Sequence, residues 1–177
     1  MLRKSFWIPV LGLLLIPAAS AHAQKYLDAG TWELTLSGSG ASNQDINAGN
    51  FGVQGSIGYY LIDQLEIIGR QTVNYADSDN IGGGTAWSAS SAVAVDYHFD
   101  LDRWQPFIGA AIGYSYGKNT NDTAFAGPEG GVKYFVKDDT FIYGLIQYQF
   151  FFNEGDDVSD AFEDGSFLYA LGIGFTW

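Results

Sequence analysis

His98 is the residue whose type most readily suggests catalysis. The sequence has two histidines, His22 and His98. A serine nucleophile needs a neighbouring base, often a histidine, that takes up its proton. The residue two positions after His98 is Asp100 rather than a serine, whereas Asp96 shares a strand face with His98 and could contact it. We therefore expect no catalytic residues, and we interpret His98 as an interior histidine with a hydrogen-bond partner.

An acidic stretch over residues 153–165 is the second group of side chains that could do chemistry. It contains no basic residue, and its carboxylates are Glu154, Asp156, Asp157, Asp160, Glu163 and Asp164. Carboxylate oxygens suit Ca²⁺ and Mg²⁺, but the spacing does not match an EF-hand loop. We interpret the stretch as a solvated acidic loop and predict no metal site and no cofactor. Divalent cation binding by this loop stays open.

The N-terminal 23 residues have the form of a secretory signal peptide. Arg3 and Lys4 precede an apolar run, and Ala21-His22-Ala23 is a small-x-small cleavage site. The apolar run is shorter than the roughly 20 residues of a transmembrane helix, although an uncleaved anchor is the alternative. We predict cleavage after Ala23, so that Gln24 begins a single domain over residues 24–177.

The composition of the remainder excludes several classes of protein. Without Arg3 and Lys4, the eight basic residues fall to six, against twenty acidic residues. A nucleic-acid-binding protein needs a basic surface, so we expect no nucleic-acid partner. The chain has no cysteine, so no disulfide framework holds an exported fold together.

An alternation of period two runs through eight segments and predicts β-strands. It is clearest at the C-terminus, where the large apolar face carries Phe167, Tyr169, Leu171, Ile173, Phe175 and Trp177. The other face of that segment is mostly small or polar. Similar alternation occurs over residues 32–37, 51–61, 65–74, 87–99, 107–116, 129–136 and 142–152. These lengths are about those of transmembrane β-strands.

The charged residues of these segments all fall on the small, polar face. They are Glu33, Glu66, Arg70, Asp96, Glu129 and Lys133, while Gln71 and Ser91 are the main polar residues of the apolar face. A Lys or Arg facing lipid near the midplane costs about 2–4 kcal/mol. No second sheet is available to cover the bulky face, so lipid is its natural partner. We predict an all-β fold, an eight-stranded antiparallel up-and-down transmembrane β-barrel; a soluble lipocalin-like periplasmic barrel is the rival fold.

The links between the segments alternate strictly in length. Short links fall at 62–64, 100–104 and 137–139, and long links at about 38–49, 76–86, 117–127 and 153–165. Outer-membrane barrels have short periplasmic turns and longer external loops. We therefore expect both termini on the periplasmic side. Two aromatic girdles follow, an inner one of Tyr59, Tyr97, Phe99, Trp104 and Trp177 and an outer one of Tyr75, Trp87, Tyr114, Tyr116 and Phe152.

With these features the chain resembles the small eight-stranded outer-membrane barrels of the OmpA/OmpX type, over nearly all of residues 24–177. The most specific part of the resemblance is the C-terminus, where Gly172, Phe175 and Trp177 fit the signal that the barrel-assembly machinery recognises. Ala170 departs from that signal, which usually has a polar residue there. The resemblance implies the outer membrane of a Gram-negative bacterium, with its lipids and lipopolysaccharide and the assembly machinery as partners.

Four charged residues are expected to meet inside such a barrel. Arg70 and Glu129 lie about seven or eight residues from their nearest short turns, and Glu66 and Lys133 three or four. The third and sixth strands of an eight-stranded barrel are nearly opposite, and side chains just fill its interior. We predict the ion pairs Arg70–Glu129 and Glu66–Lys133, because buried charges need partners. The alternative is that each charge is hydrated or paired elsewhere.

Three functions remain open. We favour a structural or surface-interaction barrel with a closed or narrow lumen, whose external loops could meet a partner. The alternatives are a small channel for solutes or hydrophobic molecules and a lipid A-modifying enzyme. An enzyme of the latter kind is expected to need a His-x-Ser pair with an acidic partner, which the sequence around His98 lacks. The sequence identifies neither a ligand nor an oligomeric state.

Overall fold

The computed structural model describes residues 27–43, 49–78, 84–117, 122–152 and 165–177. They form eight strands and no helix, so none of the described residues lies in a helix long and apolar enough to cross a membrane. The strands are β1 (Trp32–Asn43), β2 (Gly49–Ile62), β3 (Leu65–Ser78), β4 (Gly84–His98), β5 (Trp104–Gly117), β6 (Thr123–Phe135), β7 (Thr140–Phe152) and β8 (Ser166–Thr176).

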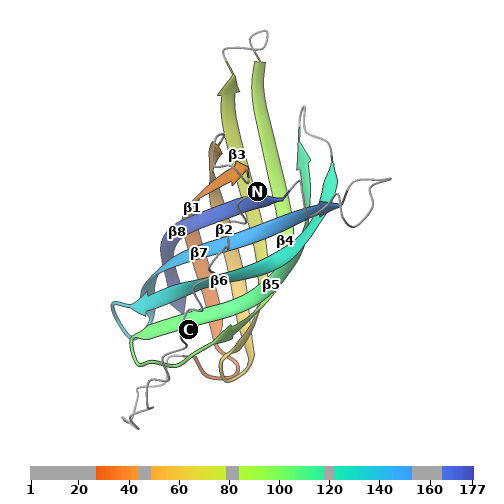
Figure 1. The fold of residues 1–177 in the computed structure, drawn as a ribbon. Helices are drawn as coiled ribbons and strands as arrows, with labels where there is room; N and C mark the ends of the chain where they lie inside the picture. Colours follow the sequence, from red (N-terminus) through yellow and green to blue (C-terminus); the bar gives the residue numbers. More distant parts are fainter. Residues whose placement is uncertain (1–26, 44–48, 79–83, 118–121, 153–164) are drawn as a thin grey trace, which may run out of the picture.

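The strands pair in sequence order, each antiparallel to the next, and β8 pairs with β1 to close the barrel (Figure 1). The last residue takes part in the closure, because the backbones of Trp177 and Trp32 exchange two hydrogen bonds of 3.0 Å. Closure leaves no strand edge with unpaired N–H and C=O groups. The predicted eight-stranded antiparallel up-and-down barrel is confirmed.

The strands are longer at one end of the barrel than the alternation predicted. The long links shrink to the segments between β1 and β2, β3 and β4, β5 and β6, and β7 and β8, that is 44–48, 79–83, 118–122 and 153–165. In β6 the strand begins at Thr123 and includes Pro128, which pairs with Ala110 of β5. Residues 38–43 and 123–128 are mostly small on both faces, so they show little alternation, although the backbone ladder continues through them. The short turns lie at 63–64, 99–103 and 136–139.

The two faces of the sheet differ as expected. Large apolar side chains point outward and are exposed, Leu171 to 74%. All six charged residues that the sequence placed on the small face are buried inside the barrel. A water-soluble protein rarely exposes an apolar surface that encircles it. The outer surface is therefore a largely apolar belt, and the six charged side chains lie inside the barrel.

Glycines on the inner face make room for large interior side chains. A Cβ atom at Gly58 would collide with the Glu66 carboxylate, one at Gly109 with Asp96, and one at Gly174 with the Phe141 ring. An outward-facing glycine such as Gly38 has open space around it instead. The inner glycines thus let a narrow barrel hold a packed interior, as barrels of eight strands generally do.

Candidate functional site: the charged interior

Arg70 and Glu129 meet across the interior of the barrel. Arg70 points inward from β3 and Glu129 from β6. The two terminal nitrogens of Arg70 each donate to one carboxylate oxygen of Glu129 at 2.8 Å. Both side chains are buried. A bidentate arginine–carboxylate pair is among the strongest polar contacts in proteins. The structure thus brings together the first pair of residues that the sequence suggested.

Lys133 lies at the centre of a second and larger group. Its Nζ is 2.9 Å from Oε2 of Glu66, the second suggested partner, and also 2.6 and 2.7 Å from the oxygens of Glu33. It donates a further hydrogen bond of 3.1 Å to the Tyr60 hydroxyl. The ammonium group therefore joins β1, β2 and β3 to β6. A buried charge with this many partners is compensated in a way that an isolated one would not be.

Aromatic rings complete the surroundings of Lys133. The Nζ atom lies 5.2 Å from the centre of the Phe141 ring, 5.6 Å from that of Tyr60 and 5.8 Å from that of Phe107. These distances are within the range of cation–π attraction. Lysine, carboxylates and rings together fill the cross-section of the barrel at this level.

His98 contacts Glu66 rather than the residues considered for catalysis. Its Nε2 atom is 3.0 Å from Oε2 of Glu66, and its side chain is fully buried. The contact with Asp96 that the shared face suggested does not form: Oδ1 of Asp96 and Nδ1 of His98 are both buried without a hydrogen-bond partner. Asp100 lies apart and accepts a hydrogen bond of 2.8 Å from Gln105. His98 is therefore a buried member of the Lys133 group.

Residues near the N-terminus close the short-turn end of the interior. Leu27 precedes β1 and is only 3% exposed, packed in one apolar cluster with Phe107, Phe135, Phe141 and Tyr60. The segment is held by hydrogen bonds from Gly30 N to the Tyr60 carbonyl oxygen at 2.8 Å and from Ala29 N to Asp63 Oδ1 at 3.0 Å. The cluster therefore continues from the rings around Lys133 into an apolar layer around Leu27 at that end.

The sequence did not reveal Glu33 and Tyr60 as partners of Lys133. The expected pairing compared heights measured along the strands and ignored their tilt. In a barrel with tilted strands, residues at the same height along the barrel axis stand at different distances from the ends of their strands. A residue near the start of β1 therefore meets a residue that lies two or more positions further along another strand. Glu33 lies on the predicted inner face, and the tilt of the strands is what brings it to the level of Lys133. Tyr60 continues the inner face of Gln54, Ser56 and Gly58 and is fully buried, and the β2–β3 register shifts only after it, between Tyr60 and Ile62.

The residues of the suggested assembly signal lie on β8 and just beyond it. Phe175 and Trp177 are exposed on the apolar belt. A Cβ atom at Gly172 would collide with the backbone of Leu36 and with Ser37. The close approach of β8 to β1 therefore requires a glycine at position 172, independently of any role in assembly.

Three polar side chains of the apolar belt form hydrogen bonds with one another. The Ser91 hydroxyl donates to Gln71 Oε1 at 2.6 Å, and Gln71 Nε2 donates to the Tyr116 hydroxyl at 3.2 Å. Gln71 Nε2 also donates to the carbonyl oxygen of Thr72 at 3.2 Å. This polar triad, Gln71, Ser91 and Tyr116, connects β3, β4 and β5 on the outer surface.

Other predictions fall outside the described residues. These are the signal peptide with Ala21, Ala23 and Gln24, and the acidic loop up to Asp164. Within the part of the chain that the structure describes, no three His, Asp or Glu side chains are grouped so that they could hold a metal ion.

Comparisons with known proteins identify the fold. No family model matches the chain, and no curated protein matches its sequence. Among solved structures, the outer membrane protein OprG from Pseudomonas aeruginosa is similar, with a TM-score of 0.61, 10% identity and coverage of 85% of this chain and 97% of OprG. Neisserial surface protein A is similar with a TM-score of 0.62 and 16% identity, and the match covers 82% of this chain and 95% of that protein. The N-terminal β-barrel domain of Pseudomonas aeruginosa OprF is similar with a TM-score of 0.57 and 20% identity, and the match covers 84% of this chain and 98% of that domain. The fold is thus that of the small outer-membrane β-barrels.

Proposed function

We propose that this protein is an integral outer-membrane barrel of a Gram-negative bacterium with a structural or surface-interaction role and a closed lumen. In this proposal the chain is exported by residues 1–23, and its C-terminal Gly172, Phe175 and Trp177 are read by the assembly machinery. The similarity of fold and the continuous apolar belt support the membrane location. Lipids and lipopolysaccharide would then surround the belt, and the external loops would be free to meet a partner.

The filling of the interior is the observation that carries the closed lumen. Lys133, Glu33, Glu66 and Tyr60 meet at hydrogen-bonding distance across the barrel, and their side chains are nearly or fully buried. Ions crossing the barrel would have to break these contacts and pass the apolar layer around Leu27. The buried ion pairs thus favour a barrel that stabilises the envelope and presents its loops over one that conducts.

Cell fractionation and gel migration test the location. We expect the protein in the outer-membrane fraction, with a folded form that migrates differently from the boiled form. A soluble periplasmic protein with the same migration before and after boiling would contradict the proposal. Loss of the protein should also raise envelope permeability to a hydrophobic dye if its role is structural.

Single-channel recording in planar bilayers separates the closed barrel from a small channel, the alternative function. That alternative draws support from inner-facing Ser56, Ser88, Ser90 and Ser115, small polar side chains that are only partly buried. We expect no discrete openings from the purified protein. Openings of defined size would instead favour the channel.

An enzymatic role is not part of the proposal. A lipid A-modifying activity would require His98 to reach substrate, whereas His98 is enclosed beside Glu66. Purified protein incubated with lipid A should therefore leave its acyl chains intact. Hydrolysis that His98→Ala abolishes would overturn this expectation.

A further inference from the structure

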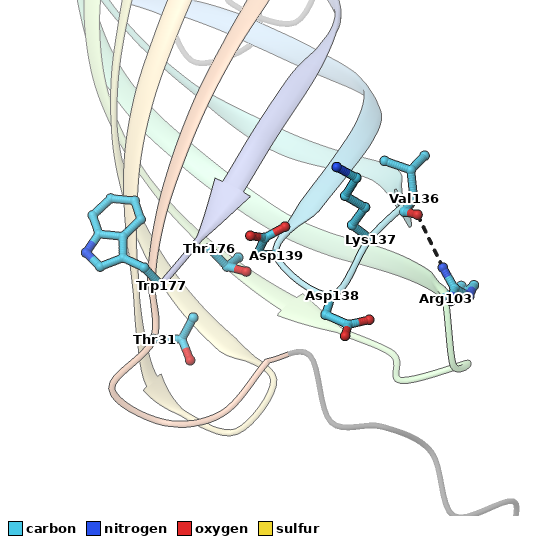
Figure 2. A pocket seen from close by; sticks show the side chains of 8 residues that line it. All are labelled: Thr31, Arg103, Val136, Lys137, Asp138, Asp139, Thr176 and Trp177. Atoms are coloured by element: carbon cyan, nitrogen blue, oxygen red, sulfur yellow. Dashed lines mark hydrogen bonds between the residues drawn. The ribbon is translucent and has the colours of Figure 1, made fainter.

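A hollow of about 650 Å³ lies at the short-turn end of the barrel (Figure 2). The turns β4–β5 and β6–β7 line one side with the charged residues Arg103, Lys137, Asp138 and Asp139. Thr31, Thr176 and Trp177, at the junction of β1 and β8, line the other side. Val136 and Trp177 in its wall are exposed and belong to the edge of the apolar belt.

The charges around this hollow are unusual for the molecule. The described residues include four basic side chains, of which Arg70 and Lys133 are inside the barrel and the other two, Arg103 and Lys137, both line the hollow. Asp138 and Asp139 follow Lys137 directly, yet among the described residues none of these four side chains forms an ion pair. Two cations and two anions thus line one hollow without forming ion pairs with one another, and Oδ1 of Asp139 accepts a hydrogen bond of 2.7 Å from the Thr140 hydroxyl.

Arg103 is held in position by the neighbouring turn. Its carbonyl oxygen accepts a hydrogen bond of 2.8 Å from Phe135 N, and its Nη1 atom donates to the Phe135 carbonyl oxygen at 3.1 Å. The same Nη1 atom lies 3.5 Å from the carbonyl oxygen of Val136 (Figure 2). These contacts use one nitrogen, so the rest of the guanidinium keeps donors for a ligand.

We propose that this hollow binds the headgroup of a phospholipid that carries both a phosphate and an ammonium group, a phosphoethanolamine lipid. Arg103 and Lys137 would bind the phosphate and the two aspartates the ammonium, while Val136 and Trp177 contact the start of the acyl chains. The inference rests on the proposed outer-membrane location, which places the short turns at the periplasmic leaflet.

Charge complementarity favours this ligand over simpler ones. A free anion would meet Asp138 and Asp139, and the chain as a whole has a net charge of −12. A free cation would leave Arg103 and Lys137 without a partner. A zwitterionic headgroup at the edge of an apolar belt meets both pairs and follows the boundary between polar and apolar surface.

Lipid retention in native mass spectrometry tests the inference. The full chain is reconstituted in vesicles of phosphatidylethanolamine and phosphatidylglycerol, extracted in mild detergent, and the bound lipids are counted. We expect phosphatidylethanolamine to be retained about tenfold more than phosphatidylglycerol, the ratio that one additional charge-assisted contact provides. Arg103→Gln/Lys137→Gln should reduce retention of both lipids, and Asp138→Asn/Asp139→Asn should remove the preference between them.

Controls separate this binding from folding and from the location. Lys137→Gln alone should reduce retention even if loss of Arg103 disturbs the turn, and Asp102→Asn, an exposed neighbour outside the hollow, should change nothing. Three results would overturn the inference. These are equal retention of both lipids, a preference that persists in Asp138→Asn/Asp139→Asn, and displacement of the lipid by soluble cell-wall peptides. Insertion is measured first by gel migration: a chain that stays soluble overturns the proposed location as well, whereas an inserted chain without the preference overturns the headgroup site alone.

Discussion

At the scale of single residues, Lys133 connects four strands, β6 with β1, β2 and β3. Its Nζ atom lies within hydrogen-bonding distance of four oxygen atoms on side chains of three other strands. Two of these side chains, Glu33 and Glu66, would be left without their shared cation if Lys133 were removed. Removing one partner of a buried ion pair costs more than removing the whole pair, because the remaining charge stays buried and uncompensated. Lys133 is thus the residue whose loss the interior should tolerate least.

Lys133→Met should lower the free energy of unfolding by about 3–5 kcal/mol, since it leaves two carboxylates buried without their cation. The measurement is urea unfolding in phospholipid vesicles, followed by the gel migration of the folded form. Asp102→Asn, at an exposed charged residue outside both the interior and the short-turn hollow, is the control and should change the stability by no more than about 0.5 kcal/mol. The double variant Glu33→Gln/Lys133→Met should recover part of the loss; equal stability of Lys133→Met and wild type would refute the role given to this lysine.

At the scale of the strands, the polar triad ties three neighbours together on a surface that otherwise carries apolar side chains. Ser91, Gln71 and Tyr116 come from β4, β3 and β5 and bond to one another. Polar groups facing lipid have no water to bond with, so each depends on the others. The triad therefore behaves as a unit in which one substitution is worse than two.

Tyr116→Phe should destabilise the barrel by about 1 kcal/mol, because it removes an acceptor of the Gln71 amide. Gln71→Leu/Tyr116→Phe should recover part of that loss, since it removes the Gln71 amide together with its acceptor and leaves only the Ser91 hydroxyl without its partner. The same unfolding assay compares the variants. Independent, additive effects of the two substitutions would show that the three side chains do not act together.

At the scale of the whole molecule, closure depends on the pairing of the first strand with the last. The Trp32 and Trp177 backbones complete this pairing, and Gly172 lets β8 approach β1. The final residue thus serves the closed barrel directly, besides any part in recognition during assembly.

Removal of Trp177 should slow insertion and reduce the folded yield in vesicles, because it deletes two backbone hydrogen bonds at the junction. Trp177→Phe keeps the backbone and an aromatic side chain and should insert nearly as wild type does. The rate of appearance of the folded band measures both variants. If deletion and Trp177→Phe impair insertion equally, the indole ring rather than the backbone closure is what matters.

Much of this architecture could be predicted from the sequence, for identifiable reasons. The alternation of Phe167, Leu171 and Phe175 with small residues defines a strand and its two faces, since side chains alternate strictly along a strand. The outer parts of strands, such as the part of β6 before Pro128, were not predicted because their side chains are mostly small on both faces. The partners of Lys133 were predicted only in part, because contacts across a lumen depend on tilt and shear, which no single strand reveals.

The burial of the Lys133 group has a consequence for the response of the protein to its medium. Dissolved ions screen the interaction between exposed charges over a Debye length of about 8 Å at physiological ionic strength, and they screen buried pairs much less. The pairs Arg70–Glu129 and Lys133–Glu33 are enclosed by the sheet and by packed side chains. Their strength should therefore be nearly independent of ionic strength. The barrel should keep the same interior ion pairs at low and at high salt concentration.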